Sequence, residues 1–95
     1  MGRKSLAEKT YEQVERDHEE EGGTWLVLYD FKGMKANSKF WANMKRVENL
    51  VDGGSLIQYS VFTTASKRGA ITVLKLAKHY GGEAILYRAE RMELK

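Results

Sequence analysis

The sequence predicts an α/β (α+β) fold in which one sheet carries helices on one of its faces, preceded by an N-terminal helix. Runs of apolar, β-branched and aromatic residues have the length of strands, and stretches with helical spacing of apolar residues alternate with them. Glycine pairs separate several of these segments. The expected order is α-β-α-β-α-β, and its two β-α-β units place one layer of helices on one face of the sheet.

Composition limits the protein to one small domain without thiol chemistry. The chain has 95 residues and no cysteine, which excludes disulfides and fits a reducing compartment. It has no apolar run near the roughly 20 residues that cross a bilayer, and its N-terminus lacks the apolar stretch of a secretory signal. We therefore expect a soluble cytoplasmic protein that does not contact membranes.

Charge divides the chain into two parts. Residues 1–23 carry four Lys or Arg and seven Asp or Glu, whereas residues 24–95 carry twelve and six, so the net charges are −3 and +6. We expect residues 1–23 to form an acidic N-terminal helix or arm and residues 24–95 to form the domain. A basic body is compatible with a nucleic-acid partner, because Lys and Arg release counterions from phosphate. Basic composition for solubility alone is the alternative.

Each predicted element has its own signal. The capping box Ser5–Glu8 starts the first helix, and a glycine pair ends it. Asn37 or Ser38 caps the second helix, and Ser66 caps the third, although Ile71, Thr72 and Val73 locally resemble a strand. The predicted helices end near Glu21, before Gly53 and at His79 or Tyr80, and the predicted strands are Thr24–Phe31, Ser55–Thr64 and Glu83–Glu90. A short extra strand within Thr63–Ala65 remains open, and Arg91–Lys95 is expected to be a short edge strand or an exchanged strand.

The first strand is apolar on both faces, which predicts a homodimer. Trp25, Val27 and Tyr29 alternate with Leu26 and Leu28. The apolar stripe of the first helix is too narrow to cover the second sheet face, so a second copy of the chain is expected to cover it. A monomer whose first helix folds across that face is the alternative.

Asp30 is the candidate catalytic and metal-binding residue. It ends the apolar first strand, and the rim of a sheet is where ligand-binding groups are often placed. Hydrolysis with Mg²⁺ needs at least two acidic ligands, so a two-fold axis near Asp30 would have to supply the second copy. An Asp that only caps the following turn is an equally open interpretation. The sequence contains no metal-ligand spacing of His or Cys and no phosphate-binding glycine motif.

Basic residues of the body are the candidates for contact with phosphate. They are Lys32, Lys35, Lys39, Arg46, Lys67 and Arg68. A solvated charged surface is the alternative for all six. The aromatic residues Trp41, Tyr59, Phe62 and Tyr87 would stack on bases only if exposed, and their spacing places most of them in the core.

Two short motifs resemble one protein family. A first strand ending in Tyr29–Asp30 and a later strand with Gln58–Phe62 (QYSVF) resemble the small CRISPR-associated adaptation proteins, which are dimeric, ferredoxin-like partners of the CRISPR integrase. The related virulence-associated ribonucleases share that general fold. The resemblance spans roughly residues 25–89. It implies a ferredoxin-like sandwich, a homodimer, and an Asp30 that binds a divalent metal such as Mg²⁺.

The resemblance leaves two classes of function. Some family members resemble metal-dependent nucleases of RNA or duplex DNA, and others hold DNA for the integrase without cleaving it. A nucleic-acid-binding dimer with endonuclease activity is therefore expected, and a non-enzymatic scaffold or protein-interaction domain is the alternative. An orphan domain that binds a small molecule is a third possibility, for which the sequence offers no signature. The acidic leader, residues 1–23, is further expected to compete with nucleic acid for the basic body.

Overall fold

The computed structural model describes residues 3–33, 35–51, 55–58, 60–90 and 92–94, and it describes residues 55–58 by their backbone alone. The described residues form three helices and four strands, so the predicted α+β class is confirmed. In chain order the elements are α1 (Leu6–Asp17), β1 (Gly22–Asp30), α2 (Ser38–Leu50), β2 (Ser55–Gln58), β3 (Val61–Ser66), α3 (Lys67–His79) and β4 (Glu83–Ala89).

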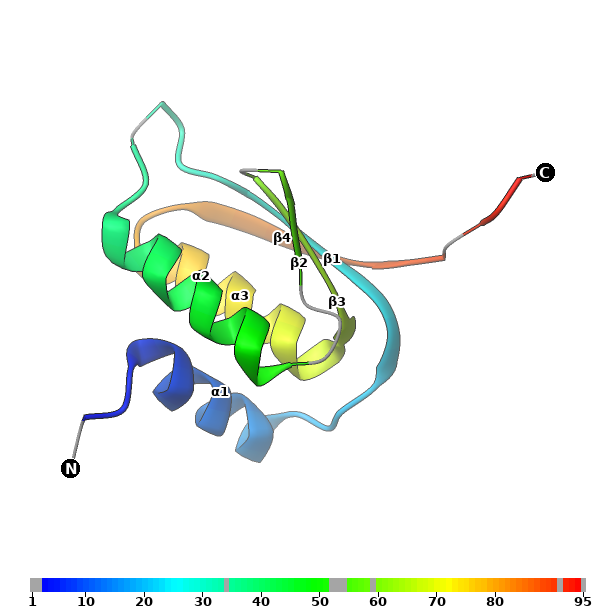
Figure 1. Ribbon diagram of the computed structural model, residues 1–95, viewed down its shortest axis with the longest axis horizontal. Coiled ribbons are helices and arrows are strands. Elements are labelled where there is room, and N and C mark those ends of the chain that lie inside the picture. The colour runs from blue at the N-terminus through cyan, green and yellow to red at the C-terminus, as the bar shows by residue number, and fades with distance from the viewer. Residues whose placement is uncertain (1–2, 34, 52–54, 59, 91, 95) are drawn as a thin grey trace.

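The four strands form one sheet in the order β2-β3-β1-β4, and every neighbouring pair is antiparallel. The apolar strand β1 therefore lies in the interior of the sheet between β3 and β4. Helix α2 connects β1 to β2, and α3 connects β3 to β4, in each case passing over one strand that runs the opposite way (Figure 1). Both crossovers place their helices on the same face, as the sequence predicted.

The prediction of one strand over Ser55–Thr64 is wrong, because this segment forms the antiparallel strands β2 and β3. Leu56 pairs with Phe62, so the chain reverses at Ser60. The segment contains no Gly, Pro, Asn or Asp, and its alternation of residue types therefore gave no turn signal. The extra strand suggested at Thr63–Ala65 falls inside β3. Helix α2 ends at Leu50, before Gly53, as predicted.

Helix α1 starts at the predicted capping box but ends at Asp17 rather than Glu21. The carboxylate of Glu8 accepts a hydrogen bond from the backbone N–H of Ser5. The hydroxyl of Ser5 accepts one from the backbone N–H of Glu8. The early end has an electrostatic reason, because three consecutive acids at a helix C-terminus would oppose the helix dipole. Helix α1 packs on α2 and α3, so it does not cover the second face of the sheet. The monomer in which it folds across that face is ruled out by this packing.

The core lies between β1 and the helices. Alternate residues of β1, namely Trp25, Val27 and Tyr29, belong to the same buried cluster as Phe40 of α2. The rings of Tyr29 and Phe31 pack edge-on against the ring of Phe40. On α2 the residues Phe40, Met44 and Val47 are buried, while Trp41 is half-buried and Leu50 is exposed. Among the helices that the structure describes, none is long and apolar enough to cross a membrane. The buried residues of the core are Ala7, Trp25, Val27, Tyr29, Phe31, Phe40, Met44, Val47, Val51, Phe62, Ala70, Val73, Leu76 and Ala77.

Candidate functional site

The face of the sheet opposite the helices is apolar and exposed. Leu28 of β1 lies directly between Val61 of β3 and Ile85 of β4, and Leu26 pairs with Tyr87. We call these five residues the open face. The side chains of Leu28, Ile85 and Tyr87 are 40%, 56% and 49% exposed. Of the four aromatic residues whose spacing placed most of them in the core, Phe62 is buried, Trp41 is half-buried and Tyr87 is exposed, and Tyr59 lies outside the described residues. A contiguous exposed apolar surface of this kind is typical of an interaction site.

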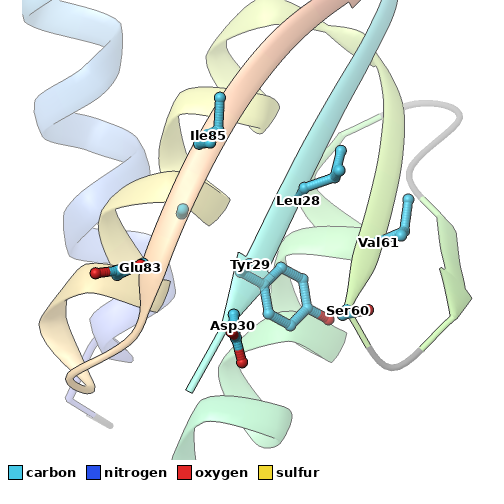
Figure 2. Close-up of a pocket in the computed structure, with 8 residues that line it drawn as sticks. Leu28, Tyr29, Asp30, Ser60, Val61, Glu83 and Ile85 are labelled. Carbon is cyan, nitrogen blue, oxygen red and sulfur yellow. The ribbon is translucent and has the colours of Figure 1, made fainter. Parts of the chain in front are cut away.

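A shallow hollow of about 430 Å³ lies where the open face ends. Figure 2 shows its lining, which comes from the adjoining ends of β1, β3 and β4. Apolar side chains form one side of the hollow, and Ser60 and two carboxylates lie toward its rim. The lining residues are Leu28, Tyr29, Asp30, Ser60, Val61, Glu83, Ala84 and Ile85.

Asp30 is exposed at the end of β1, as predicted, and it also caps the following turn. Its Oδ1 atom accepts a hydrogen bond of 2.9 Å from the backbone N–H of Lys32. Lys32 has a φ of +50° and Gly33 a φ of +77°, so this side-chain hydrogen bond stabilises a left-handed turn. One carboxylate oxygen of Asp30 therefore stabilises the turn, and the other is the one that a ligand would contact.

Glu83 is the residue that the sequence analysis missed. It is the first residue of β4 and the direct antiparallel partner of Asp30. Side chains of such a pair lie on the same face, with Cβ atoms about 5 Å apart. We call Asp30 and Glu83 the acidic rim. Glu83 does not follow an apolar run, so its own sequence context gave no signal of a site. Only the pairing of the first strand with the last brings it opposite Asp30.

Lys32 pairs with the acidic rim. Its Nζ atom lies 2.8 Å from Oε1 of Glu83, and the two side chains are 65% and 67% exposed. The hydrogen bond from Lys32 to Glu83, the charge of Glu83 and the more distant charge of Asp30 together raise the pKa of Lys32. Lys32 is therefore a cation at neutral pH.

The six predicted phosphate-contacting residues do not form one surface. Lys32, Lys35 and Lys39 lie between Asp30 and the first turn of α2, and Arg46 lies two turns further along that helix. Lys67 and Arg68 start α3, which follows Ser66, and the register pairs Ser66 with Gly22 at the opposite end of β1. The nine-residue length of β1 places them about 26 Å from Asp30.

Arg68 is committed to contacts with α1 and the segment that follows it. Its guanidinium donates hydrogen bonds to the carbonyl oxygens of His18, at 2.9 Å, and Glu15, at 3.2 Å. These carbonyls belong to the C-terminal end of α1, where unpaired acceptors favour a cation. Lys67 lies with its Nζ atom 5.8 Å from the ring centroid of Trp25. The start of α3 is thus a junction between α1 and the sheet.

Metal-ligating groups are sparse in a single copy of the chain. Within residues 3–33, 35–51, 60–90 and 92–94, no group of three or more His, Cys, Asp or Glu side chains is placed to hold one ion. The acidic rim offers two carboxylates, whose hard oxygen atoms suit Mg²⁺ by their chemistry. Comparison of the chain with protein-family models, with curated proteins and with solved structures found no match in any of the three.

Proposed function

We propose that two copies of this chain pack through their open faces, and that the dimer binds the phosphodiester backbone of RNA or duplex DNA. Cleavage that depends on Mg²⁺ would take place at the acidic rim. The observation that carries the proposal is the open face itself, with Leu28 and Ile85 side by side and exposed. Burial of such side chains contributes about 25 cal/mol for each Å² removed from water, which favours a second copy.

The end of the chain supports the same dimer. Residues 92–94 form no strand, and Figure 1 shows this segment extending away from the helices. Met92 and Leu94 are 74% and 89% exposed. Two apolar side chains at alternate positions suit a strand that adds to the sheet of a second copy. The exchanged strand expected for Arg91–Lys95 therefore belongs to this proposal, although Arg91 and Lys95 lie outside the described residues.

The topology supports a ferredoxin-like arrangement. From β1 to β4 the elements follow the order β-α-β-β-α-β, which is the order of that fold. A ferredoxin-like dimer is also what the resemblance to the CRISPR-associated adaptation proteins implies, and on that basis a CRISPR integrase is the proposed protein partner. The net charge of +6 on residues 24–95 favours a polyanion such as nucleic acid over a basic or apolar partner.

The acidic rim fits Mg²⁺ in the chemistry of its donors. Asp30 and Glu83 would hold the ion, and the ammonium of Lys32 already pairs with this negative surface. The second copy and water would supply the other ligands. When bound, Mg²⁺ supplies a Lewis acid for phosphodiester hydrolysis. In this arrangement Lys35 and Lys39, which follow Asp30 in the chain, orient the phosphate backbone.

The dimer is tested by charging two equally exposed leucines on different faces. Leu28 on the open face and Leu50 on α2 are 40% and 39% exposed. We expect Leu28→Lys to weaken dimerisation at least tenfold in analytical ultracentrifugation, because it places like charges at the dimer interface, and Leu50→Lys to leave it unchanged. Circular dichroism checks that both variants fold. A wild-type chain that stays monomeric, or equal effects of the two substitutions, would contradict the proposal.

A non-enzymatic scaffold is the second candidate, and the turn-capping hydrogen bond of Asp30 favours it. Asp30→Asn separates the two, because an Asn side chain can keep the cap and loses the charge. An enzyme loses cleavage of RNA and duplex DNA in Mg²⁺ in both Asp30→Asn and Asp30→Ala. Binding without cleavage in the wild type indicates the scaffold, and cleavage that persists in purified Asp30→Asn excludes Asp30 as the catalytic group.

A further inference from the structure

Asp30 and Glu83 are register partners, yet their carboxylates do not converge. Figure 2 shows the carboxylate of Glu83 pointing away from Asp30, although both residues lie at the same end of neighbouring strands. The contact that accounts for this orientation is the ion pair of 2.8 Å between Glu83 and Lys32. Lys32 thus holds the second acid of the rim to one side.

The turn after β1 fixes Lys32 in this position. Its backbone has a φ of +50°, a conformation that costs energy in a residue with a side chain, and the carboxylate of Asp30 binds its N–H group. Asp30 therefore organises the turn that presents Lys32 to Glu83. The three residues form one unit, in which an ammonium is the cation held by the rim.

We infer that Lys32 is a displaceable counter-ion that keeps Glu83 away from Asp30, and that Glu83 becomes the second carboxylate ligand for a divalent cation when Lys32 is drawn away. This inference rests on the proposed function, because a phosphate group of nucleic acid is the anion that would draw Lys32 away. Binding of a divalent cation and of phosphate would then strengthen each other, since each favours the same rearranged rim.

The exposure of the ion pair makes this rearrangement accessible. Both side chains are about two-thirds exposed, and exposed ion pairs are among the weakest in proteins. A phosphate that offers Lys32 a charge-assisted hydrogen bond can therefore replace Glu83. A buried ion pair at this place would not let phosphate replace Glu83 as the partner of Lys32.

Binding of Mn²⁺ to the full chain without nucleic acid, followed by electron paramagnetic resonance, tests the inference. We expect Lys32→Gln to tighten Mn²⁺ binding about tenfold, because it removes a positive charge next to the ion and releases Glu83. Lys78→Gln is the matched control. It removes the same charge from an exposed position in the last turn of α3, and its effect should stay under about twofold, because Glu83 pairs with Lys32 and not with Lys78.

A double-mutant cycle separates release of Glu83 from a general charge effect. In the Glu83→Gln background, the gain from Lys32→Gln should disappear, whereas in the background of Glu90→Gln, an exposed acid beyond β4, it should remain. A gain that persists without Glu83, or equal effects of Lys32→Gln and Lys78→Gln, overturns the inference and leaves the proposed function standing. Absence of Mn²⁺ binding in every variant overturns the metal-dependent part of the proposed function together with the inference.

Discussion

Single polar groups in the core show how the aromatic cluster behind the candidate site is built. The hydroxyl of Tyr29 is buried and has no hydrogen-bond partner in the part of the chain that the structure describes, whereas Tyr80 accepts a hydrogen bond of 3.1 Å from Nδ2 of Asn43. Both rings pack edge-on against Phe40. The two tyrosines therefore share a packing role and differ in the satisfaction of the hydroxyl.

Tyr29→Phe is expected to stabilise the protein. Removing an unsatisfied buried hydroxyl recovers its desolvation cost, about 1 kcal/mol in the free energy of unfolding. Urea denaturation at neutral pH measures this change. Tyr80→Phe is the control, and it should destabilise the protein because it removes the acceptor used by Asn43. Equal effects of the two substitutions would show that the hydroxyl of Tyr29 is satisfied in solution.

The same residue predicts a loss of stability in alkali. Burial, with a smaller contribution from the charge of Glu48, raises the pKa of Tyr29 from 10.0 to about 12. Because the folded state favours the protonated phenol, this stabilisation is complete below pH 10 and is lost as pH rises through about 12. Between pH 10.0 and about 12, the free energy of unfolding should therefore fall less steeply with pH for Tyr29→Phe than for the wild type. Denaturation measured at each pH gives this dependence.

At the level of elements, the N-terminus of α3 is joined to the acidic segment that precedes β1. The carboxylate of Glu20 accepts hydrogen bonds from the hydroxyl of Ser66, at 2.6 Å, and from the backbone N–H of Arg68, at 3.1 Å. A carboxylate at this place also interacts favourably with the helix dipole. The segment between α1 and β1 is therefore a cap for another helix, which composition alone did not indicate.

Glu20 is expected to make stability depend on pH in acid. Burial alone would raise its pKa, but the hydrogen bonds from Ser66, Arg68 and Glu21 outweigh burial and lower the pKa below 4.5. Stability from this carboxylate is therefore present above pH 4.5 and is lost as pH falls through the lowered value. Glu20→Gln should reduce this loss in acid denaturation, whereas Glu19→Gln, an exposed neighbour, should not. If Glu20→Gln and Glu19→Gln lose the same amount of stability as the pH falls, Glu20 does not act as a cap of α3.

For the whole molecule, local patterns predicted most elements and tertiary pairing decided the site. Apolar spacing located β1, α2, α3 and β4, because burial of one face is a local property of the sequence. The hairpin at Ser60 escaped prediction because the segment Ser55–Thr64 contains no Gly, Pro, Asn or Asp. The acidic rim needed the register of β1 with β4, and the separation of Lys67 from Asp30 needed the antiparallel course of β3.

The position of α1 changes how competition between the acidic leader and nucleic acid should be tested. Deletion of residues 1–23 is the obvious experiment, but Ala7 and Val14 are fully buried and Asn43 accepts a hydrogen bond of 2.9 Å from the N–H of Ala7. Loss of these contacts would destabilise α2 and α3 by several kcal/mol. Reduced binding by a truncated chain would then report unfolding rather than competition.

Neutralising exposed acids keeps the fold and isolates the charge. The double substitution Glu15→Gln and Glu19→Gln on the leader is matched by Glu90→Gln and Glu93→Gln on the body, since all four side chains are exposed. Both pairs raise net charge from +3 to +5. If the leader competes with the phosphate backbone, the leader pair tightens binding to RNA and duplex DNA more than the body pair at fixed salt, by about threefold or more. Equal gains would mean that only net charge matters, because a competing segment must act from its own position.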